Sequence, residues 1–206
     1  LTPSECRVKV GHELFTRAGP TFVGKLVNRG YSVFLDLKFH DIPNTVSRSV
    51  SAAAELGVWM TNVHVFGGVR MMTSAKQMLI EQGSDMLLIA VTVLTSIDSA
   101  ELAEIGVSSK LEHQVLHLAR QVKESGLDGV VCSAQEARLL RTEMGKNFSL
   151  VTPGIRLLGD RNYDQRRVVD PRTAVEMGSD YLVIGRAITR AEAPLEVLRQ
   201  INQLLK

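Results

Sequence analysis

The chain has 206 residues, with 24 lysines and arginines against 22 aspartates and glutamates, giving a formal net charge of +2. Its 45% of hydrophobic residues excludes a disordered chain, which could not bury enough apolar surface to fold. The near-neutral balance, together with only 5% aromatic residues, also argues against a protein that attracts nucleic-acid phosphates and stacks on bases.

Short apolar runs alternate with helical patterns along the whole chain. Strands are predicted at 6–10, 32–39, 61–66, 86–94, 129–133, 149–152 and 181–184. Helices are predicted at 45–56, 110–124, 134–143, 171–177 and 194–205. The segment 42–45 predicts a turn into the first of these helices, capped by Asn44 or Thr45. Gly30, Gly57, Gly126 and Gly178 stand before strands, as helix C-caps do.

This alternation predicts βαβ units around a parallel sheet. Most strand candidates are continuous apolar runs, which is typical of parallel strands buried on both faces. Because no linker, repeat or low-complexity tract divides the chain, we expect one α/β domain over residues 1–206 with seven visible βα units.

Two architectures fit this pattern: an open doubly wound sheet and a closed (β/α)8 TIM barrel. The dinucleotide fingerprint GxGxxG and the phosphate loop GxxxxGK[ST] are both absent. Polar residues instead follow the C-terminal ends of several strands, where a barrel gathers its chemistry at one mouth. These residues, which favour the barrel, are Lys9, those at 36–41, His64, Thr95, Ser96, Arg156 and Arg186.

The segment 34–45, FLDLKFHDIPNT, carries the strongest chemical signal. Asp36 and Lys38 are two apart on a strand and therefore point to the same face. Burying charges in an apolar strand is costly unless they are paired. They form either a structural ion pair or part of a charged site with Lys9, which lies in another apolar run, and Asp41, which follows the strand.

A candidate phosphate site lies near the C-terminus. Arg156 in TPGIR and Arg186 in IGR each follow a glycine closely at the end of a late strand. Glycine lets the backbone approach an anion, arginine binds one bidentately, and barrels place phosphate sites after their last strands. The polar segment 160–167 could cover the ligand as a lid. The alternatives are solvated surface arginines and an ordinary loop.

Cysteine content and hydropathy bear on the compartment. Cys6 and Cys132 are too few for a disulfide framework and lack metal-ligand spacing. The longest apolar run, at 86–94, is too short to span a membrane. We therefore expect a cytoplasmic protein with neither a membrane nor a nucleic-acid partner.

The motifs LDLKFHDIPNTV, KVG, VTVLTS, TPGIR, DQRR and VIGR together resemble the bacterial orotidine 5′-monophosphate decarboxylase family. The resemblance covers essentially the whole chain in the right order. It implies a TIM barrel that converts orotidine 5′-monophosphate to uridine 5′-monophosphate, the last step of de novo pyrimidine biosynthesis. It also implies a homodimer that needs neither metal nor organic cofactor.

The resemblance further assigns roles to individual residues. Lys38 would protonate C6 of the pyrimidine, Asp36 would lie beside the substrate carboxylate, and Lys9 would contact the ribose and orient Asp36. Asp41 would complete a Lys-Asp-Lys-Asp array and, with Thr45, would reach the site across the dimer interface. The remaining substrate-binding residues would be Thr95 and Ser96 at the pyrimidine and Arg156, Gln165, Gly185 and Arg186 at the phosphate.

The chain also departs from the family pattern. A barrel of this family has eight strands, whereas seven are visible here and the chain opens at what resembles the second. The first strand of the family carries an Ala-Leu-Asp motif whose aspartate binds the ribose. We therefore expect roughly 30–40 residues, one strand and one helix, to precede Leu1 in the natural protein.

Two other functions remain open. Sugar-phosphate decarboxylases and synthases of the same superfamily share an Asp-x-Lys-x-x-Asp pattern but hold an enediolate on Mg²⁺, so a chelator would stop them. An inactive barrel that only binds a nucleotide or sugar phosphate would keep its role after Lys38→Ala. Buried charges of opposite sign argue against this second hypothesis, because a protein that only binds its ligand has little use for them.

Overall fold

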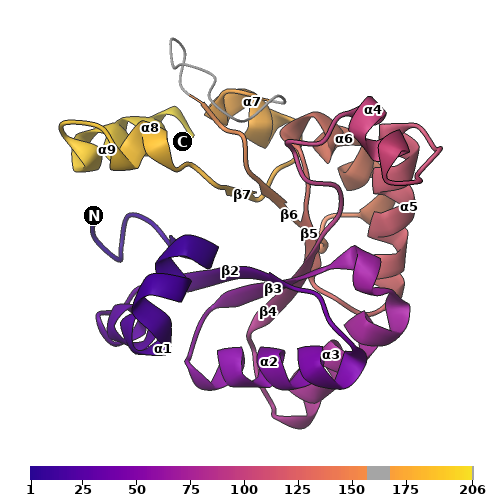
Figure 1. Ribbon diagram of the computed structural model, residues 1–206. Coiled ribbons are helices and arrows are strands. Elements are labelled where there is room, and N and C mark those ends of the chain that lie inside the picture. The colour runs from indigo at the N-terminus through magenta and orange to yellow at the C-terminus, as the bar shows by residue number, and fades with distance from the viewer. Residues whose placement is uncertain (157–167, 206) are drawn as a thin grey trace. The chain divides into compact units, whose positions relative to one another are not determined.

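The computed structural model describes residues 1–156 and 168–205 (Figure 1). Contacts divide the chain into two compact units, residues 1–91 with 121–128 and residues 92–120 with 129–206. A single domain over residues 1–206 stays a prediction. Within the described part of the chain, no helix is both long enough and apolar enough to cross a membrane.

The first unit holds four parallel strands in chain order, each pairing with the next. Its helices α2 and α3 pack against each other (Figure 1). The strands are β1 (Val8–Gly11), β2 (Val33–Phe39), β3 (Met60–His64) and β4 (Leu87–Val91). The helices are α1 (His12–Asn28), α2 (Pro43–Glu55), α3 (Val69–Glu81) and the short 3-10 turn η1 (Val65–Gly67).

The second unit repeats the pattern with three parallel strands, again paired in chain order. The strands are β5 (Gly129–Val131), β6 (Ser149–Thr152) and β7 (Tyr181–Leu182). The helices are α4 (Ser99–Glu104), α6 (Ala134–Met144), α7 (Pro171–Glu176), α8 (Arg186–Thr189) and α9 (Pro194–Leu204), while α5 (Leu111–Glu124) joins the two units in sequence. Parallel strands alternating with helices confirm the α/β class.

Continuous burial explains why the strand predictions succeed. Each of the seven predicted runs overlaps a strand of the described chain. In the first unit, Val33, Leu35, Met60, Leu88 and Ile89 are at most 1% exposed. The third run ends earlier than predicted, because Val65 and Phe66 turn into η1.

The helix predictions are incomplete, because α1, α3, α4 and α8 were not predicted as elements. Within α1, Gly19 has a φ of 65° just before Pro20, so two short helices meet at a kink. Such an interruption obscures the helical period. All four glycines predicted as C-caps have positive φ, as at Gly178, where φ is 106°.

The predicted cap of α2 is wrong. The helix begins at Pro43, its N-cap is Ile42, and neither Asn44 nor Thr45 caps it with a side chain. Proline suits the first helical position because its φ is already helical and its missing N–H would have no partner there. Side-chain capping boxes do occur elsewhere, in α4 with Asp98 and in α6 with Ser133.

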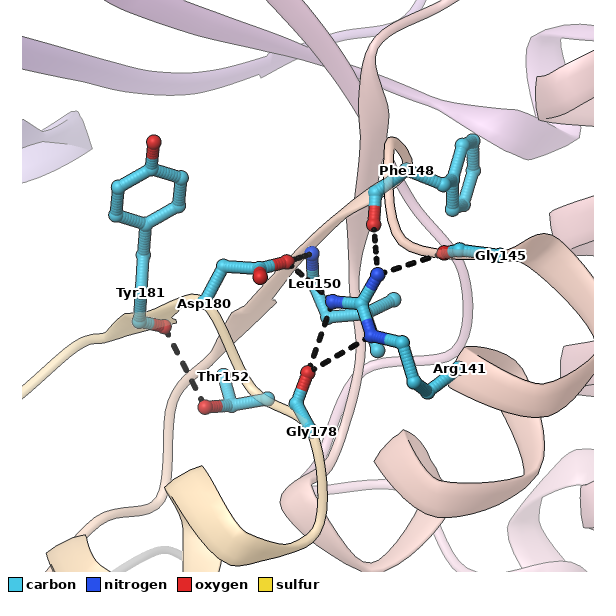
Figure 2. A network of polar contacts seen from close by, with 8 residues as sticks. All are labelled: Arg141, Gly145, Phe148, Leu150, Thr152, Gly178, Asp180 and Tyr181. Carbon is cyan, nitrogen blue, oxygen red and sulfur yellow. Dashed lines mark hydrogen bonds and ion pairs between the residues drawn. The ribbon is translucent and has the colours of Figure 1, made fainter.

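An arginine–aspartate network joins α6 to the starts of β6 and β7 (Figure 2). The Arg141 guanidinium donates to the carbonyl oxygens of Gly145, Phe148 and Gly178 and forms a 2.5 Å ion pair with Asp180. Asp180, directly before β7, also accepts a 2.7 Å hydrogen bond from the Leu150 backbone N–H. One side chain thus satisfies carbonyls that end α6 and precede two strands.

The first unit contains a counterpart of this network. Asp128 accepts a 2.8 Å hydrogen bond from the Leu88 backbone N–H of β4 and pairs with Lys76 of α3, also at 2.8 Å. In both units an aspartate placed two residues after a positive-φ glycine fixes the start of a strand to a cation on a helix.

We expect Arg141→Ala to lower the free energy of unfolding by about 2–4 kcal/mol, since it leaves several carbonyls and a carboxylate without their donor. Urea denaturation followed by circular dichroism measures this. Arg138→Ala, an exposed arginine on the same helix, should change stability by less than about 0.5 kcal/mol. Equal losses for the two variants would contradict the role given to the network.

Candidate active site

Three charged side chains from β1 and β2 meet in the first unit. Lys9 Nζ lies 2.9 Å from Asp36 Oδ2, and Lys38 Nζ lies 2.6 Å from Asp36 Oδ1. Asp36 is only 9% exposed, whereas the side chains of Lys9 and Lys38 are 35% and 28% exposed. Two ammonium groups share one carboxylate, so this cluster has a net positive charge that suits an anionic ligand.

An irregularity in β2 places Lys38. Leu35 pairs with Thr61 of β3, but the next pair is Phe39 with Val63, so four steps along β2 match two along β3. Lys38 has a φ of 46°, the only positive φ of a residue other than glycine in the described chain. Left-handed backbone is costly for a residue with a Cβ atom, and such strain is concentrated at functional sites.

The side chain of Asn62 in β3 closes this bulge. Its Oδ1 accepts a 2.8 Å hydrogen bond from the Lys38 backbone N–H, and its Nδ2 donates a 2.8 Å bond to Asp36 Oδ1. The residue is fully buried. Sequence reasoning missed Asn62, because the neighbouring Thr61 is polar as well and nothing in the local pattern distinguishes the two residues.

The electrostatics keep Asp36 ionised. Burial by itself raises the pKa of this carboxyl group, but the nearby charges of Lys9 and Lys38, with hydrogen bonds from Lys38 and Asn62, outweigh it. The resulting pKa lies below the ordinary value of an aspartate. The carboxylate therefore remains negative at neutral pH although it is almost fully enclosed.

Two histidines stand beside the cluster. His64, at the end of β3, stacks on His40 with ring centroids 5.6 Å apart and on Phe66 at 5.5 Å. Burial, followed by the charges of His40 and Lys38, lowers the pKa of His64 to about 4. His64 is therefore uncharged at neutral pH and adds no third cation to the cluster.

This shift predicts how stability depends on pH. Between pH 6.5 and about 4 the unfolded chain protonates His64 while the folded chain does not, so acidification across this window destabilises the fold. We expect His64→Gln to lose less stability than the wild type when the pH falls from 7.5 to 5. Urea denaturation at both pH values measures the difference; equal losses would contradict the buried neutral histidine.

Asp41 and Thr45 are exposed and lie outside the three-residue cluster. Asp41 lies two residues after the end of β2, and its Oδ1 accepts a 2.6 Å hydrogen bond from the Ile42 backbone N–H at the start of α2. Thr45 lies in the first turn of α2, where its carbonyl accepts a 2.9 Å bond from Ser49 Oγ.

The predicted phosphate residues belong to the second unit and follow neighbouring strands. Arg156 comes after β6 and is half-buried, with its Nη1 donating a 2.8 Å bond to the Ile155 carbonyl. Gly185 is the N-cap of α8 and Arg186 is its first residue. Both lie shortly after β7, from which the chain continues through Val183, whose N–H donates to the Thr152 carbonyl. Because β6 and β7 are parallel, both segments leave the sheet at the same edge.

Other predicted residues have simpler descriptions. Thr95 is buried and Ser96 is exposed, in the turn that follows β4 in the sequence. A methyl group at Gly185 would meet nothing within 4 Å, so the backbone there is open to a ligand. Gln165 and the predicted lid at 160–167 lie outside the described residues. Over residues 1–156 and 168–205, no group of three or more His, Cys, Asp or Glu side chains could hold a metal ion.

An α/β fold with a buried charged cluster on neighbouring parallel strands fits an enzyme of the (β/α)-barrel class, and comparisons with known proteins show this class. The orotidine 5′-phosphate decarboxylase from Lactobacillus acidophilus superposes with a TM-score of 0.89 at 42% identity, covering 100% of this chain and 89% of that one. The enzyme from Pyrococcus horikoshii, at 21% identity, shares the fold with a TM-score of 0.79 over 99% of this chain and 89% of that one.

Sequence comparisons narrow the class to a family. The profile of the orotidine 5′-phosphate decarboxylase / HUMPS family matches residues 1–201. The orotidine 5′-phosphate decarboxylases of Vibrio campbellii and Photobacterium profundum are 59% and 60% identical over 206 residues, covering 100% of this chain and 88% and 89% of theirs. The chain belongs to this family, and its fold is the barrel-type α/β fold of these enzymes. It is a carboxy-lyase of the orotidine 5′-phosphate decarboxylase type.

Proposed function

We propose that this chain decarboxylates orotidine 5′-monophosphate to uridine 5′-monophosphate. The observation that carries the proposal is the pair of ammonium groups within 2.6 and 2.9 Å of one buried carboxylate, one of them on a strained backbone. Removing CO₂ from C6 of the pyrimidine leaves an electron pair on that carbon. The developing negative charge needs a fixed cation, and the resulting carbanion needs a proton donor beside it.

Lys38 supplies both in this mechanism. The bond between C6 and the carboxylate breaks, CO₂ leaves, and the electron pair remains on C6. The Lys38 ammonium first stabilises that charge and then transfers a proton from Nζ to C6, which leaves a neutral amine that solvent reprotonates. Because the strained backbone holds this lysine before substrate arrives, little reorganisation is needed during the reaction.

Asp36 and Lys9 set the charge around the reacting carbon. An ionised Asp36 beside the substrate carboxylate opposes it by like-charge repulsion, which ends as CO₂ departs. Lys9 holds Asp36 through the 2.9 Å ion pair and contacts the ribose in this proposal. Because this repulsion weakens substrate binding, contacts with other parts of the nucleotide must supply the binding energy.

That binding energy comes from the pyrimidine and phosphate ends. Thr95 and Ser96 contact the base, while the phosphate is held by Arg156, Gln165, Gly185 and Arg186. Support comes from the open backbone at Gly185 and from the common edge at which the segments after β6 and β7 emerge. Contacts far from C6 offset the repulsion at the carboxylate.

We further propose that the active form is a cytoplasmic homodimer. Asp41 and Thr45 are both exposed, and Ile42 between them is 67% exposed, so a polar pair frames an apolar side chain. A second copy of the chain would bury this side chain and bring Asp41 and Thr45 to the neighbouring site.

The test is loss of the ultraviolet absorbance of orotidine 5′-monophosphate, measured with and without EDTA. Continued turnover in EDTA supports the proposal. Turnover of a sugar phosphate that EDTA stops would assign the chain to a metal-dependent reaction instead. Nucleotide binding without turnover would indicate a protein that only binds its ligand.

A further inference from the structure

Asn62 makes contacts that no role proposed above uses. It comes from β3, whereas Asp36 and Lys38 come from β2, and it bonds to both of them: to the backbone N–H of Lys38 and to Oδ1 of Asp36, each at 2.8 Å. Asp36 Oδ1 is also the atom that Lys38 Nζ contacts at 2.6 Å. One buried amide therefore holds the carboxylate and the backbone of the lysine at once.

The bulge explains why this amide is needed. Where the pairing between β2 and β3 is interrupted, between Leu35 and Phe39, the Lys38 N–H has lost its usual strand partner. A buried N–H without an acceptor is costly, and so is a φ of 46° at a lysine. The Asn62 carbonyl oxygen replaces the missing strand acceptor in that conformation.

We infer that Asn62 is a positioning residue for the decarboxylation, holding the Lys38 backbone in its strained conformation and aligning Asp36 with the lysine ammonium. The amide suits both tasks, because one end accepts from an N–H and the other donates to a carboxylate. An aspartate here would set a second negative charge against Asp36. A leucine would satisfy neither partner. This inference rests on the proposed function.

The experiment compares Asn62→Ala and Asn62→Asp with Thr61→Val. Thr61 is the neighbouring residue on β3; it is fully buried and donates a 2.9 Å hydrogen bond to the Leu35 carbonyl of β2. Its removal therefore weakens the same strand pair without touching the cluster. Turnover of orotidine 5′-monophosphate, affinity for uridine 5′-monophosphate and thermal unfolding are measured for all four proteins.

We expect Asn62→Ala to lower kcat about 10- to 100-fold, because it removes hydrogen bonds to a charged group and to a catalytic residue. KM and the affinity for uridine 5′-monophosphate should change less than about threefold. Thr61→Val should lower the unfolding temperature and keep kcat within about threefold. A kcat within threefold of the wild type in Asn62→Ala, or an equal loss of kcat in Thr61→Val, would overturn the inference.

Asn62→Asp tests the positioning role of Asn62 if the alanine variant does not fold. It keeps an acceptor for Lys38 but places a carboxylate beside Asp36, so the pKa of Asp36 rises and the acid limb of the kcat profile moves to higher pH. An unmoved acid limb with wild-type kcat would contradict the inference. If the wild type itself turns over no orotidine 5′-monophosphate, the proposed function fails, which is distinct from turnover that Asn62 does not influence.

Discussion

Lys38→Ala is expected to lower kcat for orotidine 5′-monophosphate by at least about 1,000-fold, because one substitution removes both the cation at C6 and the proton donor. Alanine incurs the same backbone strain as lysine at a φ of 46°, so the bulge should survive the change. Affinity for uridine 5′-monophosphate should change little, since the product has no carboxylate. Absorbance kinetics and titration calorimetry measure the two effects.

Lys76→Ala is the matched control for this variant. Lys76 is also ion-paired, at 2.8 Å to Asp128, and its side chain is 20% exposed, but it serves the start of β4. Its loss should reduce stability and leave kcat within about twofold. If Lys38→Ala keeps more than a tenth of wild-type kcat, or if Lys76→Ala loses as much activity, Lys38 is not the proton donor.

Gly129→Ala is expected to lower the free energy of unfolding by about 3 kcal/mol or more, or to prevent folding. A methyl group on Gly129 would lie 2.1 Å from the backbone oxygen of Ser149, its partner across the β5–β6 pair. Backbone cannot rotate away as a flexible side chain can, so the strands must separate. Thermal and urea unfolding of purified protein measure the loss.

The control is Gly24→Ala in α1. A methyl group there meets nothing within 4 Å, and alanine favours the helical state more than glycine does. Its stability should rise by up to about 1 kcal/mol. If Gly129→Ala is as stable as Gly24→Ala, the close approach of β5 and β6 is not a constraint on the fold.

The strands could be predicted because parallel strands are buried on both faces and leave a continuous apolar run in the sequence. Helices were predicted where apolar residues at helical spacing mark one face, as in α5. The kink at Gly19 interrupts this spacing, so α1 was not predicted. Pro43 moved the start of α2 ahead of Asn44 and Thr45, because the fixed φ of proline defines the first turn without any side-chain cap.

The charged cluster was predictable in part. Spacing alone places Asp36 and Lys38 on one face, and their burial demands a partner. Asn62 was not predictable, because its importance arises from a change of register between two strands, which no local pattern records. Lys9 was already a candidate for the same site because it lies in another apolar run, and the pairing of β1 with β2 brings its ammonium group to 2.9 Å from Asp36.

The strained backbone of Lys38 has an evolutionary consequence. A residue that costs about 1–2 kcal/mol to hold in place persists only while selection maintains the reaction it serves. Glycine, or asparagine to a lesser degree, relieves that cost at once. A descendant no longer selected for this reaction would therefore gain stability by replacing the lysine. At this position the same substitution abolishes activity and stabilises the fold.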